Sequence, residues 1–161
     1  MGNSLKSLMD IKERHKHLSS EELERFGDEY YLSHSWIKKM RALKYYAKAK
    51  TPSSIFKIMN FPLNDEGDGE NTMKFQLLKD IDTDEANYCK GRIFDSVLGG
   101  YQNYSGYRIE DMEDLSSIRS KHYRSVEWCK DMALYYYNKS NLPQAKAASN
   151  RIYYERHNVY N

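Results

Sequence analysis

Two cysteines and five histidines are the residues of this 161-residue chain whose types most readily suggest a nucleophile, a base near neutral pH or a zinc ligand. Cys89 and Cys129 lie far apart and form no Cys-x-x-Cys motif, so the sequence predicts neither a cysteine zinc site nor a disulfide scaffold. His15 and His17 are two residues apart, a spacing that does not bring both to one face of a helix. The sequence contains no glycine-rich phosphate loop and no Gly-x-Ser-x-Gly motif. We therefore expect a protein that is not an enzyme and holds no metal ion or cofactor.

Binding is then the expected function, and residues 27–46 carry the strongest local signals for the elements that would support it. Gly27-Asp28 is expected to end a preceding helix, and Tyr30-Tyr31-Leu32 is short, aromatic and typical of a strand. Ser35 is placed to cap a helix that begins at Trp36. Apolar residues recur along that helix at steps of three and four, which predicts a stripe facing the core: Trp36, Met40, Leu43 and Ala47.

This order of residues resembles the opening of the DUSP domain, which accompanies many ubiquitin-specific proteases. A Gly-Asp pair, a strand of the form aromatic-Tyr-Leu and a helix beginning at Trp follow one another in that family, as they do here from Gly27 to Trp36. The family's later Pro-Gly-Pro-Ile-Asp-Asn turn corresponds to residues 61–65, which lack the first Pro and the Gly. The resemblance covers residues 19–110. It implies docking onto a larger protein partner or complex, with four positions carried over from the family's turn: Pro62, Leu63, Asn64 and Asp65.

Together these patterns predict an α+β fold, in which a helix-rich small domain with a short antiparallel sheet occupies residues 19–112. Residues 1–18 are expected to form an N-terminal helical arm, and residues 113–161 a C-terminal helical hairpin with a basic, tyrosine-rich tail. Within the hairpin, residues 138–142 break the helical pattern and Pro143 suits the first turn of the second helix. This part resembles the helical hairpin found beside Smr domains and also a tetratricopeptide-type hairpin, but no nuclease domain follows it.

Two further boundaries follow from composition. Residues 64–71 are rich in Asn, Asp, Glu and Gly and are expected to form a loop. A helix is expected over residues 86–98 and should end at Gly99-Gly100.

Charge is distributed unevenly, which favours a charged partner. From Leu115 to the end, eight Lys/Arg stand against three Asp/Glu, although the whole chain has a net charge of only +2. The alternative to protein docking is therefore binding to RNA or to a ribonucleoprotein such as the ribosome, with cations meeting phosphates and tyrosines stacking on bases. The residues that would do so are Lys38, Lys39, Arg41, Lys44, Lys48, Lys50, Arg151, Tyr153, Tyr154, Arg156, His157 and Tyr160.

The sequence shows no signal peptide and no apolar run long enough to cross a bilayer. The two cysteines suit a reducing compartment, so we expect a cytoplasmic protein with no membrane partner. A third interpretation is a subunit of a larger assembly, anchored by the N-terminal arm.

Overall fold

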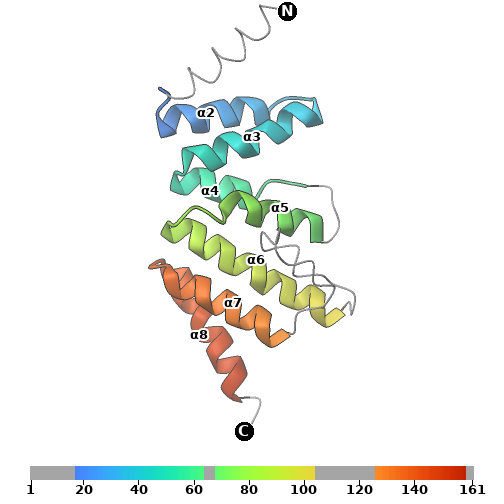
Figure 1. Ribbon diagram of the computed structural model, residues 1–161, viewed down its shortest axis with the longest axis vertical. Coiled ribbons are helices and arrows are strands. Elements are labelled where there is room, and N and C mark those ends of the chain that lie inside the picture. The colour runs from blue at the N-terminus through green and yellow to red at the C-terminus, as the bar shows by residue number, and fades with distance from the viewer. Residues whose placement is uncertain (1–16, 64–67, 104–125, 159–161) are drawn as a thin grey trace, which may run out of the picture. The chain divides into compact units, whose positions relative to one another are not determined.

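The computed structural model describes residues 17–63, 68–103 and 126–158, and within each of these ranges the chain is largely helical (Figure 1). The chain divides into two compact units, unit 1 ending at Ile58 and unit 2 beginning at Met59. In chain order the helices are α2 (Ser20–Tyr31), α3 (Trp36–Ala49), α4 (Pro52–Met59), α5 (Asp68–Leu78), α6 (Asp84–Asn103), α7 (Val126–Lys139) and α8 (Pro143–Asn158).

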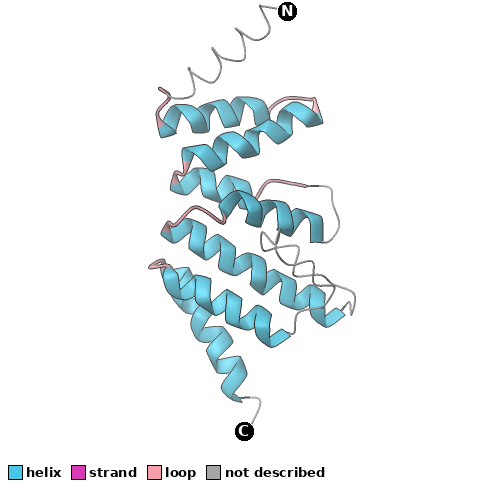
Figure 2. Cartoon of the chain, viewed as in Figure 1, coloured by secondary structure: helices cyan, strands magenta, loops and turns pink. Residues whose placement is uncertain are grey.

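The predicted α+β fold with a short antiparallel sheet is wrong, because the described residues contain no strand (Figure 2). Tyr30 and Tyr31 form the last turn of α2, and Leu32 is its C-cap. The Tyr30 ring stacks on the Tyr45 ring of α3 with 5.2 Å between centroids. Tertiary packing of this kind overrides the strand propensity of aromatic residues. For the same reason α2 continues through Gly27 instead of ending there.

Other expected boundaries have mixed outcomes. The helix starting at Trp36 and the helix with Pro143 in its first turn are confirmed. α5 begins at Asp68, so the second half of the predicted loop at 64–71 is helical, while residues 64–67 lie outside the described part. α6 runs through Gly99-Gly100 to Asn103, because a glycine inside a helix lowers its stability by about 1 kcal/mol without necessarily ending it. Residues 1–16 of the expected arm also lie outside the described part.

Unit 1 is built on one close contact between α2 and α3. A Cβ atom at Gly27 would lie 2.5 Å from Cε1 of Tyr46, so only glycine leaves room for this ring. The Tyr46 ring is buried, and its hydroxyl donates a hydrogen bond of 2.7 Å to Oδ1 of Asp28. α3 then ends at Ala49, and its C-cap Lys50, with a φ of 55°, turns the chain toward α4. The contact sets both the separation of the two helices and the rotation of α3 about its axis.

A lysine of α4 packs against the α2–α3 pair by forming ion pairs with two carboxylates of α2. Nζ of Lys57 lies 2.7 Å from Oε2 of Glu24 and 3.0 Å from Oδ1 of Asp28. The hydroxyls of Thr51 and Ser53 also donate hydrogen bonds to Glu24. Burial by itself raises the pKa of the Glu24 carboxyl, but the hydrogen bonds from Lys57, Thr51 and Ser53 outweigh burial and lower the pKa below its usual value.

The same design recurs in unit 2, where α6 packs against α7. A Cβ atom at Gly91 would lie 2.6 Å from Cε1 of Tyr137. The buried Tyr137 donates a hydrogen bond of 2.9 Å to Oδ2 of Asp95, and Arg151 of α8 pairs with the same carboxylate. Each unit therefore has a glycine under a tyrosine ring, an aspartate on the glycine's helix, and a cation supplied by a later helix.

A cluster of aromatic side chains packs within unit 2. The buried Phe94 of α6 makes edge contacts with Phe75 of α5 at 5.4 Å and with Trp128 of α7 at 5.5 Å between centroids. Tyr136 stacks on the same ring at 5.8 Å. Such pairs add about 0.5–1.5 kcal/mol each beyond the burial of area, so Phe94 ties three helices together.

Later residues close the ends of two helices in unit 2. The buried Lys90 of α6 donates a hydrogen bond of 2.9 Å to the carbonyl oxygen of Ile81, just beyond the end of α5. At the start of α6, the Asp84 side chain accepts a hydrogen bond of 3.0 Å from the backbone N–H of Asn141, in the turn between α7 and α8. The Ser140 hydroxyl donates a second, of 2.8 Å, to the carbonyl oxygen of Asp84.

Candidate functional site

The exposed face of α3 is not the one that the sequence predicts. Of the four residues in the predicted core stripe, only Leu43 is buried, and Trp36 is exposed. Because Tyr46 must lie over Gly27, α3 is turned by about 100°, the angle of one residue step, from the predicted orientation. Its buried side consists of Ala42, Leu43, Tyr46 and Ala49.

This rotation leaves three cations in one line on the outer side of α3, which we call the basic stripe: Arg41, Lys44 and Lys48. Lys38 and Lys50 extend the positive charge at the two ends of the helix, whereas Lys39 lies over the Tyr31 ring, 4.5 Å from its centroid. None of these cations makes an ion pair or a side-chain hydrogen bond with any residue that the structure describes. Among the described residues, therefore, no carboxylate neutralises the charge of the basic stripe.

Three large apolar side chains are exposed where α2 turns into α3, and we call them the corner. The exposed fractions are 78% for Leu32, 43% for Trp36 and 73% for Ile37. Single exposed apolar residues are common on protein surfaces, but adjacent ones are typical of interaction sites. Ile37 lies four residues before Arg41, so the corner and the basic stripe share one face of the helix. Together they form what we call the α3 surface.

The first turn of α3 also departs from what stabilises a helix. Its N-cap, Ser35, makes no side-chain hydrogen bond to the helix, and its first turn contains lysines and no acid. α2 shows the usual arrangement: Ser19 accepts a 3.2 Å hydrogen bond from the backbone N–H of Glu22, and two acids lie in its first turn. Since the N-terminus of a helix carries partial positive charge, lysines there are unfavourable. The positive charge at the start of α3 is therefore not compensated by an acidic residue of its own first turn.

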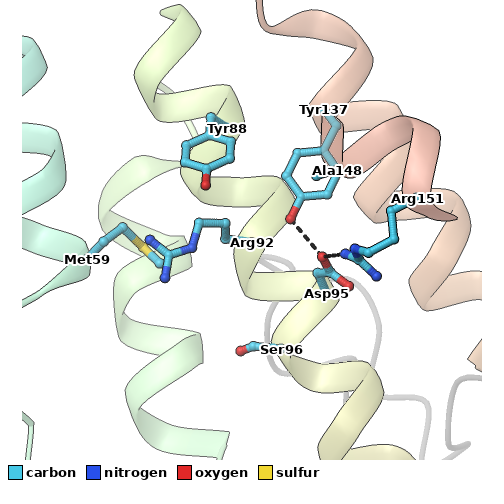
Figure 3. A pocket seen from close by; sticks show the side chains of 8 residues that line it. All are labelled: Met59, Tyr88, Arg92, Asp95, Ser96, Tyr137, Ala148 and Arg151. Carbon is cyan, nitrogen blue, oxygen red and sulfur yellow. Dashed lines mark hydrogen bonds and ion pairs between the residues drawn. The ribbon is translucent and has the colours of Figure 1, made fainter. Parts of the chain in front are cut away.

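Unit 2 contains a cleft of about 410 Å³ formed by α6, α7 and α8, together with Met59 (Figure 3). Polar side chains of α6 lie along it at steps of four, and Figure 3 shows Asp95 receiving Tyr137 and Arg151 from the opposite side. We call this the unit 2 cleft. Its lining residues are Met59, Tyr88, Arg92, Asp95, Ser96, Tyr137, Ala148 and Arg151.

The charges in the unit 2 cleft are unequally paired. Asp95 accepts from both Tyr137 and Arg151, and burial together with this carboxylate raises the pKa of the Tyr137 phenol. Arg151 also pairs with Glu155 of its own helix at 3.3 Å. The exposed Arg92 makes no hydrogen bond or ion pair with the described residues, and its guanidinium carbon lies 5.9 Å from the centroid of the Tyr88 ring. Arg92 is therefore a cation of the cleft that no described carboxylate compensates.

The docking positions and the C-terminal RNA-binding residues predicted from the sequence do not form one site. Pro62 is exposed and Leu63 half-buried, while Asn64, Asp65 and Tyr160 lie outside the described residues. On α8, Arg151 is held by Asp95, and Arg156 pairs with Asp131 at 2.7 Å. The exposed aromatic residues of α8 are Tyr153, Tyr154 and His157.

Sequence reasoning missed Leu32 and Ile37 at the corner and Arg92 in the cleft. Two features of the sequence pointed toward these regions. The first turn after Ser35 contains lysines where acids are usual, and Tyr88, Arg92 and Ser96 recur at steps of four on one face of α6.

The two cysteines are buried free thiols, and burial raises the pKa of both Cys89 and Cys129 to about 12. A thiol of this kind is a poor nucleophile at neutral pH because the thiolate is the reactive form. Among the residues that the structure describes, no group of three or more His, Cys, Asp or Glu side chains is placed to hold a metal ion. None of the described helices is both long enough and apolar enough to span a membrane.

Comparison of the chain with models of protein families, with curated proteins and with solved structures found no match.

Proposed function

We propose that this chain is a non-catalytic docking protein whose α3 surface binds an acidic segment of a partner protein that also carries apolar side chains. The observation that carries the proposal is the junction of the corner with the basic stripe, both on one face of α3. An acidic segment would neutralise the stripe while its apolar side chains cover the corner. The unreactive environment of both cysteines supports binding over catalysis. Free thiols suit the reducing cytoplasm, which we include in the proposal.

The composition of the corner favours a protein over RNA as the partner. Leu32 and Ile37 are aliphatic, and they gain stability by leaving water, about 1.5–3 kcal/mol for each side chain fully buried. RNA is held by stacking on aromatic rings and by phosphate contacts, to which aliphatic groups add little. On α8, moreover, the two arginines predicted to meet phosphates are already paired with carboxylates.

The start of α3 favours an acidic partner. Its backbone N–H groups lack a side-chain cap, and its first turn adds lysines to the positive end of the helix dipole. Carboxylates are stabilised at such a position. Residues that lower the stability of a helix tend to occur at functional sites, where the free energy of binding can offset the lost stability.

The experiment is affinity capture from cell extract on the immobilised full chain, with and without RNase. One double variant removes the corner (Leu32→Ser with Ile37→Ser), and a second reverses the stripe (Arg41→Glu with Lys44→Glu). We expect the bound proteins to survive RNase and to fall by about tenfold or more in both double variants, because each loses apolar burial or charge pairing worth more than 1.4 kcal/mol.

A matched control reverses two exposed cations elsewhere, Arg25→Glu with Lys146→Glu, and should keep the bound proteins. Capture that disappears with RNase would mean that the partner is RNA or is held through RNA. Capture that persists in both α3 double variants would show that docking takes place on another surface. Either result overturns the proposal.

A further inference from the structure

The unit 2 cleft shares no residue with the α3 surface, and it offers a second, separate place for a ligand. We propose that the cleft binds a single carboxylate of a short acidic peptide segment, held by the guanidinium of Arg92. This site goes beyond the docking function proposed for α3 and does not depend on it.

Arg92 is the group that defines the ligand's charge. Its guanidinium lines the cleft without a hydrogen bond or ion pair to the described residues. Its guanidinium carbon lies 5.9 Å from the centroid of the Tyr88 ring, within the range of a cation–π contact. A guanidinium presents parallel N–H donors that match the two oxygens of a carboxylate.

The other charged groups of the cleft favour a monovalent anion. Asp95 is occupied by the Tyr137 hydroxyl and by Arg151, and Arg151 is shared with Glu155 of its own helix. Arg92 is the cation of the lining that no described side chain pairs with, so a ligand meets its single positive charge. One carboxylate balances that charge, whereas a phosphate dianion would exceed it and would lie close to the Asp95 carboxylate. The chemistry therefore selects a carboxylate over a phosphate.

The remaining lining suits a peptide better than a free small acid. The volume of about 410 Å³ lies in the range of roughly 300–1,000 Å³ that is typical of ligand pockets. Met59 and Ala148 supply apolar surface for a neighbouring side chain of the ligand, and the Ser96 hydroxyl can hydrogen-bond to its backbone. Acetate alone would use only the guanidinium.

The experiment titrates the ¹⁵N-labelled full chain with the peptide acetyl-Leu-Glu-Leu-amide and follows the guanidinium N–H resonance of Arg92, assigned from its loss in Arg92→Gln. We expect the glutamate peptide to shift this resonance and the backbone resonances of neighbouring α6 residues. The glutamine twin, acetyl-Leu-Gln-Leu-amide, should bind about tenfold more weakly or less well still, because it lacks the charge-assisted bidentate pair. Arg92→Gln should abolish the backbone shifts, and Arg92→Lys should weaken them strongly, since lysine keeps the charge without the planar donors.

Lys146→Gln makes the same change of charge on an exposed part of α8 outside the lining residues and should leave binding unchanged.

Equal binding of the two peptides, or no response to the glutamate peptide, would overturn the assignment of a carboxylate. Unchanged peptide binding in Arg92→Gln would overturn the assignment of the site. Displacement of the peptide by inorganic phosphate at a lower concentration than by acetate would make phosphate the ligand and would also overturn the proposal. The double variants of the α3 surface should bind this peptide normally, so that failure of either proposal can be recognised separately.

Discussion

Replacing Lys38 by glutamate should stabilise unit 1 while weakening docking. Lys38 is the third residue of α3, counted from Trp36, and follows an N-cap that makes no side-chain bond. The substitution removes a cation from the positive end of the helix and places an anion there. It also creates the Ser-x-x-Glu pattern of a capping box with Ser35. Each charge at a helix terminus contributes about 0.3–1 kcal/mol, so the expected gain is about 1 kcal/mol.

The matched control is Lys48→Glu in the last turn of the same helix. Both substitutions change the net charge equally, and each new glutamate gains one cationic neighbour, Arg41 for position 38 and Lys44 for position 48. The helix dipole, however, favours an anion at position 38 and disfavours one at position 48. The difference between the two variants therefore reports the position of the charge, and we expect it to be about 1–2 kcal/mol.

Hydrogen exchange of the α3 amide groups measures this difference within unit 1 alone. A gain of about 1 kcal/mol would slow exchange through opening of the hairpin about fivefold in Lys38→Glu. Lys48→Glu should exchange as fast as the parent chain or faster. Salt of about 0.5 M should reduce the difference, because it screens exposed charges. If Lys48→Glu protected α3 as well as Lys38→Glu does, the total charge and not the uncapped start would control stability, and our reasoning about α3 would be refuted.

Three further predictions test the packing and the titrating groups. Gly27→Ala should destabilise unit 1 by about 1–3 kcal/mol in chemical denaturation, because its methyl group would overlap the buried Tyr46 ring; a net gain from alanine's helix propensity would contradict the close contact. Glu24 has a lowered pKa, so its ion pair stabilises the fold above the unfolded carboxyl pKa and is lost as the pH falls through the folded pKa; Glu24→Gln should flatten the acid side of the stability profile, and an unchanged profile would count against the pair. Cys89 and Cys129 should not react with a thiol reagent at pH 8 until the chain is unfolded, since burial raises the pKa of both to about 12; rapid labelling of the native chain would show that the thiols are accessible.

Local signals predict the helix starts because they act over a few neighbouring residues. Ser19 caps α2 and Pro143 begins α8, as their residue types suggest. The rotation of α3 could not be predicted in this way. The stripe containing Trp36 and Leu43 is as regular as the one that is buried, and only the contact between Gly27 and Tyr46 decides between them. Periodicity alone does not contain that information.

The candidate sites show the same limit. The clustering of cations on α3 could be predicted from the sequence, but the exposure of Ile37 depends on the rotation of the helix. The unit 2 cleft takes Arg92 from α6, Tyr137 from α7 and Arg151 from α8. Residues from three helices come together only once α6 and α7 have packed through Gly91, so no short motif marks the cleft.

The bonds that close the helix ends of unit 2 have a consequence for synthesis on the ribosome. The end of α5 is closed by Lys90, and the start of α6 is held by Ser140 and Asn141. Since each closing group is made after the helix it serves, the nascent helices stay frayed until the segment around residue 141 has left the exit tunnel. Unit 2 should therefore acquire protease resistance in one step, once residues 140 and 141 have emerged, and not helix by helix.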